Sequence, residues 1–576
     1  MAIGWLTLAA CWFFTIQSQP LFEPDEGRYA EIPREMVASG DWVTPRLNDI
    51  KYFEKPPLQY WATAAAYSVF GVSEWSSRLW AFWLSFACIP LTYAFARAMY
   101  GTRVGVAAAL ALCTNPLYLV VGHFNLLDSA FTFFTTAAIF SFVMSRHASS
   151  DPRRERRWML SMWASLACAI LTKGIAVLVL MSATVVAYSV LARDARVWRR
   201  WHAGVGLPLL LLLTVPWFAT VTLRNPEFPR FFFVHEHIAR FLTTVDDRVG
   251  PWWYFLPLVV LAVAPWIPRL GTSLRVAWQG RPNVAAPDMT GRFLAVWCVL
   301  VLLFFSASQS KLPPYILPAM PALSVLLALA VDDAAVRRAG WINSGLIALL
   351  ATGMAGLAWH RFGMPLPRML GWTAAALLAS ALGVLLVRRT GSIWSGPRSA
   401  LGLACVSILG WQALIMTYAA LTPARTALPL VKTVGPSIAP GEAIYSVGEY
   451  RQSVAPYLGR TLRLVAYRGE FDFGLRHDTV PYLATLGSFM SEWQRHQDAV
   501  AFVSPEAYAE LVRRGAPMRK LASDDRSVVV SRRLAPVTTT NASTNDAVTW
   551  SRMRIVRPAR SATHHQQDLR PDRKSG

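Results

Sequence analysis

The side chains best suited to chemistry lie at residues 20–60, directly after an apolar run from Met1 to Ile16. Adjacent carboxylates, Asp25 and Glu26, stand near the start of this segment, and Lys55 precedes two prolines near its end. A charge beside hydrocarbon must be paired, hydrated or functional, because leaving it isolated costs a few kcal/mol. Carboxylates and a cation framed by aromatic residues suit an anionic, lipid-borne substrate. The alternative is that these charges form the solvated face of an interfacial loop.

Lys55, Arg240 and Tyr315 form a candidate phosphate-binding set. Charge-assisted hydrogen bonds are about twice as strong as neutral ones, so an ammonium, a guanidinium and a hydroxyl favour phosphate in a low-dielectric cavity. Prolines stiffen the backbone next to Lys55 and Tyr315. Taken singly, Lys55 could instead snorkel to the interface, and Tyr315 could belong to an interfacial aromatic belt.

Asp128, in the stretch HFNLLDSAF, begins an apolar run at the same membrane level as Asp25. A carboxylate in the first turn of a helix is favoured by the helix dipole, so a structural role is open. Two acids near phosphate-binding cations could also handle an activated sugar.

The triplet His235-Glu236-His237 resembles a metal or phosphate site. Histidines at i and i+2 do not share a helix face, so the spacing is weak evidence for a metal. A zinc site would need a ligand from another segment, for example Glu54. The alternative is that both histidines form hydrogen bonds within an interfacial helix.

The composition places these residues in a polytopic membrane protein. The 576 residues are 54% hydrophobic and 16% charged, and many runs approach the roughly 20 apolar residues that a spanning helix needs. A net charge of +22 would suit a nucleic-acid partner, but Lys and Arg stand between apolar runs and report topology, so we expect no nucleic acid. The six cysteines lie in apolar runs without CxxC spacing and predict no disulfide framework or zinc knuckle.

Thirteen apolar runs predict about thirteen transmembrane helices, which are expected at residues 1–16, 79–96, 104–121, 126–144, 158–171, 175–191, 205–221, 252–267, 293–307, 315–331, 341–358, 369–387 and 400–420. Arginine-rich loops alternate with other loops, and the positive-inside rule makes the arginine-rich ones cytoplasmic. The segments expected outside are 20–78, 123–125, 172–174, 224–250, 308–314 and everything after 421. Nearly all candidate residues lie on that outer side.

Two domains and a tail are expected along the chain. Residues 1–421 form the transmembrane domain, with outer loops 20–78 and 224–250. Residues 422–534 alternate between strand-like and helix-like pieces and predict a soluble, periplasmic α/β domain, whose strands are expected at 443–447, 462–465, 499–503, 518–521 and 528–531. Its helices are expected at 449–458, 481–497 and 505–514. Residues 535–576 predict a disordered tail.

The stretches FEPDEGRYAEIPREM and KYFEKPPLQYW, together with SKLPPYILP ending at Pro318, resemble the protein O-mannosyltransferase-like superfamily. These are polyprenyl-phosphate-dependent glycosyltransferases of the C-type fold. Within that superfamily the sequence is most similar to the bacterial lipid A aminoarabinose transferases. The resemblance implies inverting transfer of 4-amino-4-deoxy-L-arabinose from undecaprenyl phosphate to a lipid A phosphate, on the periplasmic face of the inner membrane. That reaction gives resistance to polymyxin and other cationic antimicrobial peptides.

The resemblance also implies roles for individual residues. It makes Asp25 the main catalytic carboxylate and Asp128 a second acidic partner. It places the carrier phosphate on Lys55, Arg240 and Tyr315, in a cavity that Tyr52 and Arg28 line. It also suggests a structural divalent metal, zinc, near Glu54 and His235. No cofactor is expected to be required for catalysis.

A lipid A phosphate is already largely ionised at neutral pH, since its second pKa is about 6. We therefore expect Asp25 to orient the sugar and stabilise developing positive charge more than to remove a proton. One rival interpretation is a related transferase for another sugar or for a protein acceptor. A lipid or ion transporter is another, because intramembrane carboxylates also mark ion pathways; it would predict inverted repeats with broken helices, and the sequence shows no such repeat.

Overall fold

The computed structural model describes residues 2–193, 198, 200–243, 250–279, 289–363, 367–389, 397–496 and 498–533. The predicted disordered tail, 535–576, lies outside the described residues.

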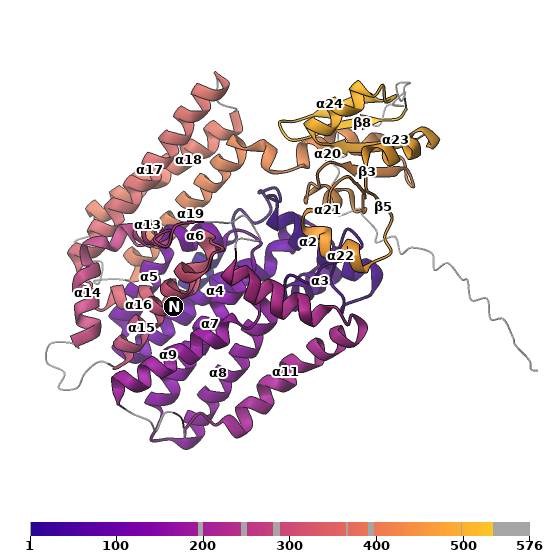
Figure 1. The fold of residues 1–576 in the computed structure, drawn as a ribbon. Coiled ribbons are helices and arrows are strands. Elements are labelled where there is room, and N and C mark those ends of the chain that lie inside the picture. Colours follow the sequence, from indigo (N-terminus) through magenta and orange to yellow (C-terminus); the bar gives the residue numbers. More distant parts are fainter. Residues whose placement is uncertain are drawn as a thin grey trace, which may run out of the picture.

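Helices make up most of the first 421 residues (Figure 1). The long ones are α4 (Glu74–Tyr100), α7 (Leu127–His147), α8 (Pro152–Lys173), α9 (Ala176–Ala192), α11 (Ala203–Arg224), α15 (Met289–Ala307), α17 (Asp333–Phe362), α18 (Pro367–Arg389) and α19 (Pro397–Leu421). The shorter ones are α1 (Ala2–Trp12), α5 (Thr102–Cys113), α6 (Pro116–Gly122), the π-helix η1 (Arg230–Ala239), α12 (Arg240–Leu242), α13 (Phe255–Ala262), η2 (Ala264–Trp266), α14 (Ile267–Gln279), η3 (Pro313–Ala319) and α16 (Met320–Ala328).

Among the described residues, seven helices are long and apolar enough to cross a membrane, or up to nine if each of two bent pairs is one span. One pair joins α5 to α6 at 65°, and the other joins α13 to the 264–279 segment at 66°. Pro116 and Pro265 stand at the two breaks, as expected of a residue that cannot continue the hydrogen bonding of a helix. Twelve of the thirteen predicted apolar runs fall in one of these helices, in a bent pair or in a shorter apolar helix. The remaining run, 158–171, lies in α8, whose arginine-rich first turns keep it out of this set of apolar helices. The chain is a multi-pass membrane protein.

The predicted outer loop 20–78 is largely folded. It contains α2 (Asp25–Ser39), a hairpin of β1 (Arg46–Leu47) with β2 (Ile50–Lys51), and α3 (Leu58–Phe70). The hairpin turn at Asn48 and Asp49 has positive φ at both residues, which is typical of a tight type I′ turn. Glu35 of α2 accepts the backbone N–H of both turn residues, at 2.6 and 2.8 Å. A buried carboxylate thus ties the hairpin to α2, a contact that hydrophobic patterning does not reveal.

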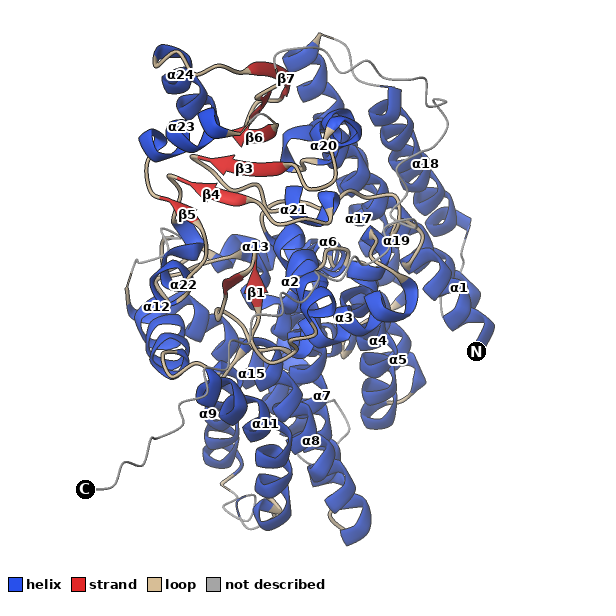
Figure 2. Ribbon diagram, turned by 90° about the vertical axis from the view of Figure 1, so that its right-hand side faces the viewer, coloured by secondary structure: helices blue, strands red, loops and turns tan. Residues whose placement is uncertain are grey.

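The C-terminal residues form a six-stranded sheet in the order β5-β4-β3-β6-β8-β7 (Figure 2). Its strands are β3 (Ala443–Val447), β4 (Arg463–Val465), β5 (Tyr482–Leu483), β6 (Ala499–Val503), β7 (Arg519–Ser523) and β8 (Val528–Ser531). Its helices are η5 (Pro423–Arg425), α20 (Leu428–Val434), η6 (Gly435–Ser437), α21 (Val454–Leu458), η7 (Gly469–Phe471), α22 (Asp472–His477), α23 (Leu486–Arg495) and α24 (Pro505–Arg513). The strands from β5 to β6 pair in parallel, and β8 pairs antiparallel with β6 and β7.

The two faces of this sheet have different partners, because successive strand residues point to opposite sides. Tyr445 faces α23 and α24 in one apolar cluster. Ile444 and Phe502 belong to a second cluster, which also contains Tyr29 and Ile32 of α2. The sheet domain therefore shares a core with the 20–78 segment and lies over it at one end of the helical part (Figures 1 and 2).

Candidate active site

Asp25 and Glu26 open α2, but only Asp25 is available to a ligand. The Glu26 side chain is 2% exposed and receives both Nε and Nη2 of Arg78, each at 2.8 Å. It also accepts the backbone N–H of Asn125 at 2.8 Å. The Asp25 side chain is 37% exposed, and its nearest cation is Arg28, at 3.9 Å. Glu26 therefore anchors α2 to α4 through Arg78, while the Asp25 carboxylate stays partly exposed.

Arg28 stands at the centre of a group of carboxylates, which we call the Arg28 network: Arg28 with Asp25, Glu54 and Glu470. Its nitrogens lie 3.7 Å from Glu54 and 3.8 Å from Glu470, and its guanidinium carbon is 5.5 Å from the ring centre of Tyr52. Burial opposes the charge, but Tyr52 and the surrounding carboxylates raise the pKa of Arg28 well above its ordinary value. Arg28 is a permanent buried cation beside Asp25.

Lys55 and Arg240, far apart in sequence, meet at Glu236. Glu236 Oε2 lies 3.1 Å from Lys55 Nζ and 2.8 Å from Arg240 Nη1. The Glu236 side chain is 4% exposed; burial would raise its pKa, but Lys55, His235 and Arg240 together lower it strongly. Arg240 also lies 4.0 Å from Glu54, which joins this Glu236 cluster to the Arg28 network. The predicted phosphate-binding cations are thus side by side and connected to Asp25.

The π-helix η1 carries Glu236 and packs against the turn that follows α8. His237 donates from Nδ1 to the carbonyl of Phe232, at 2.7 Å. Gly174, at φ +93°, leaves room for this imidazole: a Cβ there would lie 2.1 Å from Nε2 of His237. On the other side, Phe241 accepts the backbone N–H of Gln309 at 3.0 Å. The described parts of segments 172–174, 224–250 and 308–314, all predicted on one side of the membrane, do meet.

Asp128 and Tyr315 converge on Lys173, the last residue of α8. Lys173 Nζ is 2.5 Å from the Asp128 carboxylate and 4.6 Å from the ring centre of Tyr315. The predicted second acid is thus paired with a cation that sequence reasoning assigned only to an outer loop. Gly174, the next residue, contacts η1, so this group lies beside the Glu236 cluster.

Several buried polar atoms around Arg28 have no hydrogen-bond partner within the described chain. They are Nε of Arg28 and the hydroxyls of Tyr52 and Tyr60. Burial raises the pKa of Tyr60, as do nearby carboxylates, Glu54 foremost, so its hydroxyl stays protonated. Buried polar groups are normally satisfied, so these atoms are free to form hydrogen bonds with a bound ligand.

The residues predicted to bind zinc do not fit a metal site. In the part of the chain that the structure describes, no group of three His, Cys, Asp or Glu side chains could hold a metal ion. Glu54 faces two guanidinium groups, and His235 stacks on Phe231 at 5.1 Å between ring centres. A metal would have to displace Arg28 or Arg240 from Glu54.

Sequence analysis named Glu236 only as part of a triplet that resembles a metal or phosphate site, and gave it no role of its own. It did not single out Lys173 or Glu470, and Lys173 stood in a short loop without a motif. Glu470 belongs to the C-terminal domain, whose contact with Arg28 has no signal in the sequence. Charge balance was the usable signal for Glu236: two buried cations need a carboxylate.

Two family models match the chain. The model described as dolichyl-phosphate-mannose-protein mannosyltransferase matches residues 20–232, and the one described as aminoarabinose transferase C-terminal domain matches residues 430–532. These ranges contain Asp25, Lys55 and Asp128 in the first, and Glu470 in the second.

A crystal structure of ArnT from Cupriavidus metallidurans bound to undecaprenyl phosphate superimposes with a TM-score of 0.81. The two sequences are 31% identical, and the alignment covers 93% of this chain and 98% of that one. The chain belongs to the aminoarabinose transferase family. The apo state of the same protein aligns with a TM-score of 0.79.

Curated members of the family share the name undecaprenyl phosphate-alpha-4-amino-4-deoxy-L-arabinose arabinosyl transferase. The protein of Edwardsiella ictaluri is 33% identical over 62% of this chain, and that of Pseudomonas aeruginosa strain UCBPP-PA14 is 35% identical over 61%. The matched part spans 64% and 63% of those relatives' lengths. The predicted family, the C-type membrane fold with an α/β domain, and the glycosyltransferase class are confirmed.

Proposed function

We propose that this chain transfers 4-amino-4-deoxy-L-arabinose from undecaprenyl phosphate to a phosphate of lipid A. Family membership supports the donor, since a relative's structure holds undecaprenyl phosphate. The acceptor and the amino sugar follow from the family name. Adding an ammonium-bearing sugar reduces the negative charge of the outer surface, which weakens attraction of cationic peptides such as polymyxin.

The observation that carries this proposal is the meeting of Lys55 and Arg240 at Glu236, within reach of Asp25 through Arg28 and Glu54. Lys55 and Arg240 bind the carrier phosphate in the proposal, and Tyr315 closes the site from η3. As the sugar leaves, charge builds on this phosphate, and cations fixed in advance stabilise it without reorganising. Glu236 keeps the two cations in place when no phosphate is bound.

Asp25 acts on the sugar in this proposal. Its carboxylate faces developing positive charge at the anomeric carbon, and Arg28 holds it at 3.9 Å. Tyr52 and Arg28, with their unpartnered polar atoms, orient the sugar hydroxyls. Asp128, paired with Lys173, is the second acid and sets the charge at the Tyr315 side of the site.

The proposed location is the bacterial inner membrane, with the active site and the sheet domain on the periplasmic side. Arginine-rich loops on the opposite side support this orientation through the positive-inside rule. Transfer in this proposal requires no cofactor, because Lys55 and Arg240 supply the charge neutralisation that a metal would otherwise provide.

Purified full-length chain in lipid nanodiscs tests the proposal directly. Undecaprenyl-phosphate aminoarabinose and lipid A are supplied, and mass spectrometry follows lipid A. We expect lipid A to gain one aminoarabinose per modified phosphate, and no gain with undecaprenyl-phosphate mannose. Transfer of a different sugar, or transfer to protein only, would refute the proposal while leaving the family assignment intact.

A further inference from the structure

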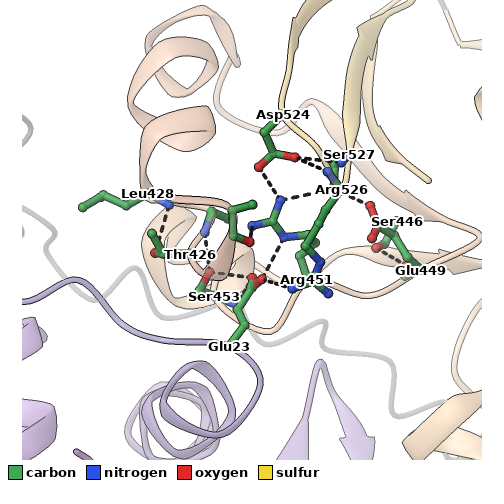
Figure 3. Close-up of polar contacts among 12 residues, drawn as sticks. Glu23, Thr426, Leu428, Ser446, Glu449, Arg451, Ser453, Asp524, Arg526 and Ser527 are labelled. Atoms are coloured by element: carbon green, nitrogen blue, oxygen red, sulfur yellow. Dashed lines mark hydrogen bonds and ion pairs between the residues drawn. The ribbon is translucent and has the colours of Figure 1, made fainter. Parts of the chain in front are cut away.

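The C-terminal domain binds Glu23, which lies two residues before Asp25, through ion pairs and hydrogen bonds (Figure 3). Glu23 is 2% exposed at its side chain, and its carboxylate accepts from Arg451 Nε at 2.8 Å, Arg526 Nη1 at 3.0 Å and Ser453 Oγ at 2.6 Å. Arg451 is 1% exposed and also pairs with Asp524 at 2.7 Å. A charged pair this deeply buried keeps its geometry, since losing a partner leaves an uncompensated charge.

The same domain also contacts Gly27 and Arg28, two and three residues after Asp25. Gly27 lies against the backbone of Gln452, so a Cβ there would be 2.5 Å from the Gln452 carbonyl carbon. Glu470 extends one carboxylate oxygen to within 3.8 Å of Arg28, and Tyr467 donates to the other oxygen at 2.7 Å.

These contacts hold the chain on both sides of Asp25, at Glu23 before it and at Gly27 and Arg28 after it. Only Pro24, whose ring fixes its φ, separates Glu23 from Asp25. The α2 helix cannot shift toward or away from the sheet domain without breaking the Glu23–Arg451 pair or colliding at Gly27. An apolar cluster common to α2 and the sheet domain, which includes Tyr29, closes the same interface.

The Glu470 side chain reaches a cavity at this interface. It lines a cavity of about 800 Å³ between the two parts of the chain, together with Pro24 and Arg28. Its side chain is 14% exposed, so a change of its charge is felt in the cavity rather than in the core of the sheet domain.

We propose that the C-terminal domain is part of the active centre, in which Arg451 positions Asp25 through Glu23 and Glu470 orients Arg28. This inference rests on the proposed function. A displacement of a reacting group by about 1 Å can cost on the order of 100-fold in rate, so such positioning acts mainly on the chemical step. Donor binding should be spared, because Lys55 and Arg240 lie on other elements, the 52–57 segment and η1 with α12.

The test compares Arg451→Met and Glu470→Gln in the full-length chain with Arg533→Met. Arg533 is the matched control, because its ion pairs are with Asp498 and Glu442 of the same domain. We expect both test variants to lower kcat at least about tenfold while the KM for donor changes less than about twofold. The control should keep the wild-type kcat. Wild-type kcat in both test variants, or a rise in donor KM as large as the fall in kcat, overturns the inference.

A second pair of variants keeps the claim testable if Arg451→Met does not fold. Gly27→Ala forces a Cβ into the Gln452 backbone, whereas Gly204→Ala, also helical, meets nothing within 4 Å. We expect a lower kcat for Gly27→Ala alone, with both proteins folded by thermal melting. Absence of transfer by the wild-type chain would refute the proposed function, whereas wild-type transfer with unaffected variants would refute only the positioning role.

Discussion

Asp25 and Glu26 are neighbours in the sequence, yet their side chains have opposite environments. Glu26 is buried against Arg78, and Asp25 is partly exposed beside Arg28. The sequence singled out this acidic pair, because charges next to an apolar run are costly and conspicuous. It could not predict which of the two is free, since that depends on which side of α2 meets a helix some fifty residues later.

Replacing either carrier-phosphate cation should weaken donor binding. We expect Lys55→Ala and Arg240→Ala each to reduce affinity for undecaprenyl phosphate at least about tenfold, because a charge-assisted contact is worth about 1.5–3 kcal/mol. Lys51→Ala is the matched control, since Lys51 lies four residues from Lys55 and pairs with Glu227 at 2.8 Å. Titration with undecaprenyl phosphate in nanodiscs measures the affinities. Equal affinities for all three variants and the wild type would contradict the proposal that Lys55 and Arg240 bind the carrier phosphate.

The lowered pKa of Glu236 predicts a specific pH dependence of stability. A carboxyl whose folded pKa lies below its ordinary value of 4.5 stabilises the fold fully above that value and loses this contribution as pH falls toward the folded pKa. The difference in melting temperature between wild type and Glu236→Gln should therefore stay constant from pH 8 to pH 5. It should shrink only below about pH 4.5. A difference that vanishes between pH 7 and pH 5 would contradict an ionised Glu236.

Metal removal should leave transfer unchanged. Glu54 is already opposite Arg28 and Arg240, and no third ligand accompanies it and His235 among the described residues. Transfer rates measured before and after dialysis against a chelator test this prediction. If dialysis lowered the rate and added zinc restored it, Glu54 would have to exchange its guanidinium partners for a metal.

At the scale of elements, long apolar helices and buried strands were the most predictable features. Strands β3, β6 and β8 have the predicted bounds, because their burial on both faces gives continuous apolar runs. The predicted helix 481–497 instead contains β5 before α23, since two edge residues carry too little pattern to identify. The 20–78 segment is folded through polar contacts such as Glu35 with the hairpin turn, which no periodicity reveals.

The contact between η1 and the end of α8 should matter for activity. Gly174 and Gly71 both have positive φ with extended ψ. This backbone conformation costs residues other than glycine about 1–3 kcal/mol, so alanine should destabilise the fold at either position. Only Gly174→Ala also pushes the His237 ring off its bond to Phe232. We expect similar losses of thermal stability, but a fall in transfer for Gly174→Ala alone. Equal transfer by both variants would mean that this contact does not shape the site.

At the scale of the whole molecule, segments separated by hundreds of residues form one site. Residues 23–28, 52–55, 236–240 and 470 are joined by ion pairs, and 128, 173 and 315 lie beside them across Gly174. The positive-inside rule predicted that these segments share one side of the membrane. It could not predict which ones touch, because side-by-side placement on one face is set by helix packing.

In the proposed mechanism Asp25 acts in transfer, while a separate cluster of cations binds the carrier. The most direct measurement compares Asp25→Asn with Asp41→Asn, whose carboxylate is similarly exposed, at 32%, and pairs with Arg224 at the surface. Undecaprenyl phosphate affinity and aminoarabinose transfer to lipid A are measured on the same nanodisc samples. We expect Asp25→Asn to lose transfer and to keep carrier affinity within about threefold, while Asp41→Asn keeps both. Transfer by Asp25→Asn at the wild-type rate would contradict it.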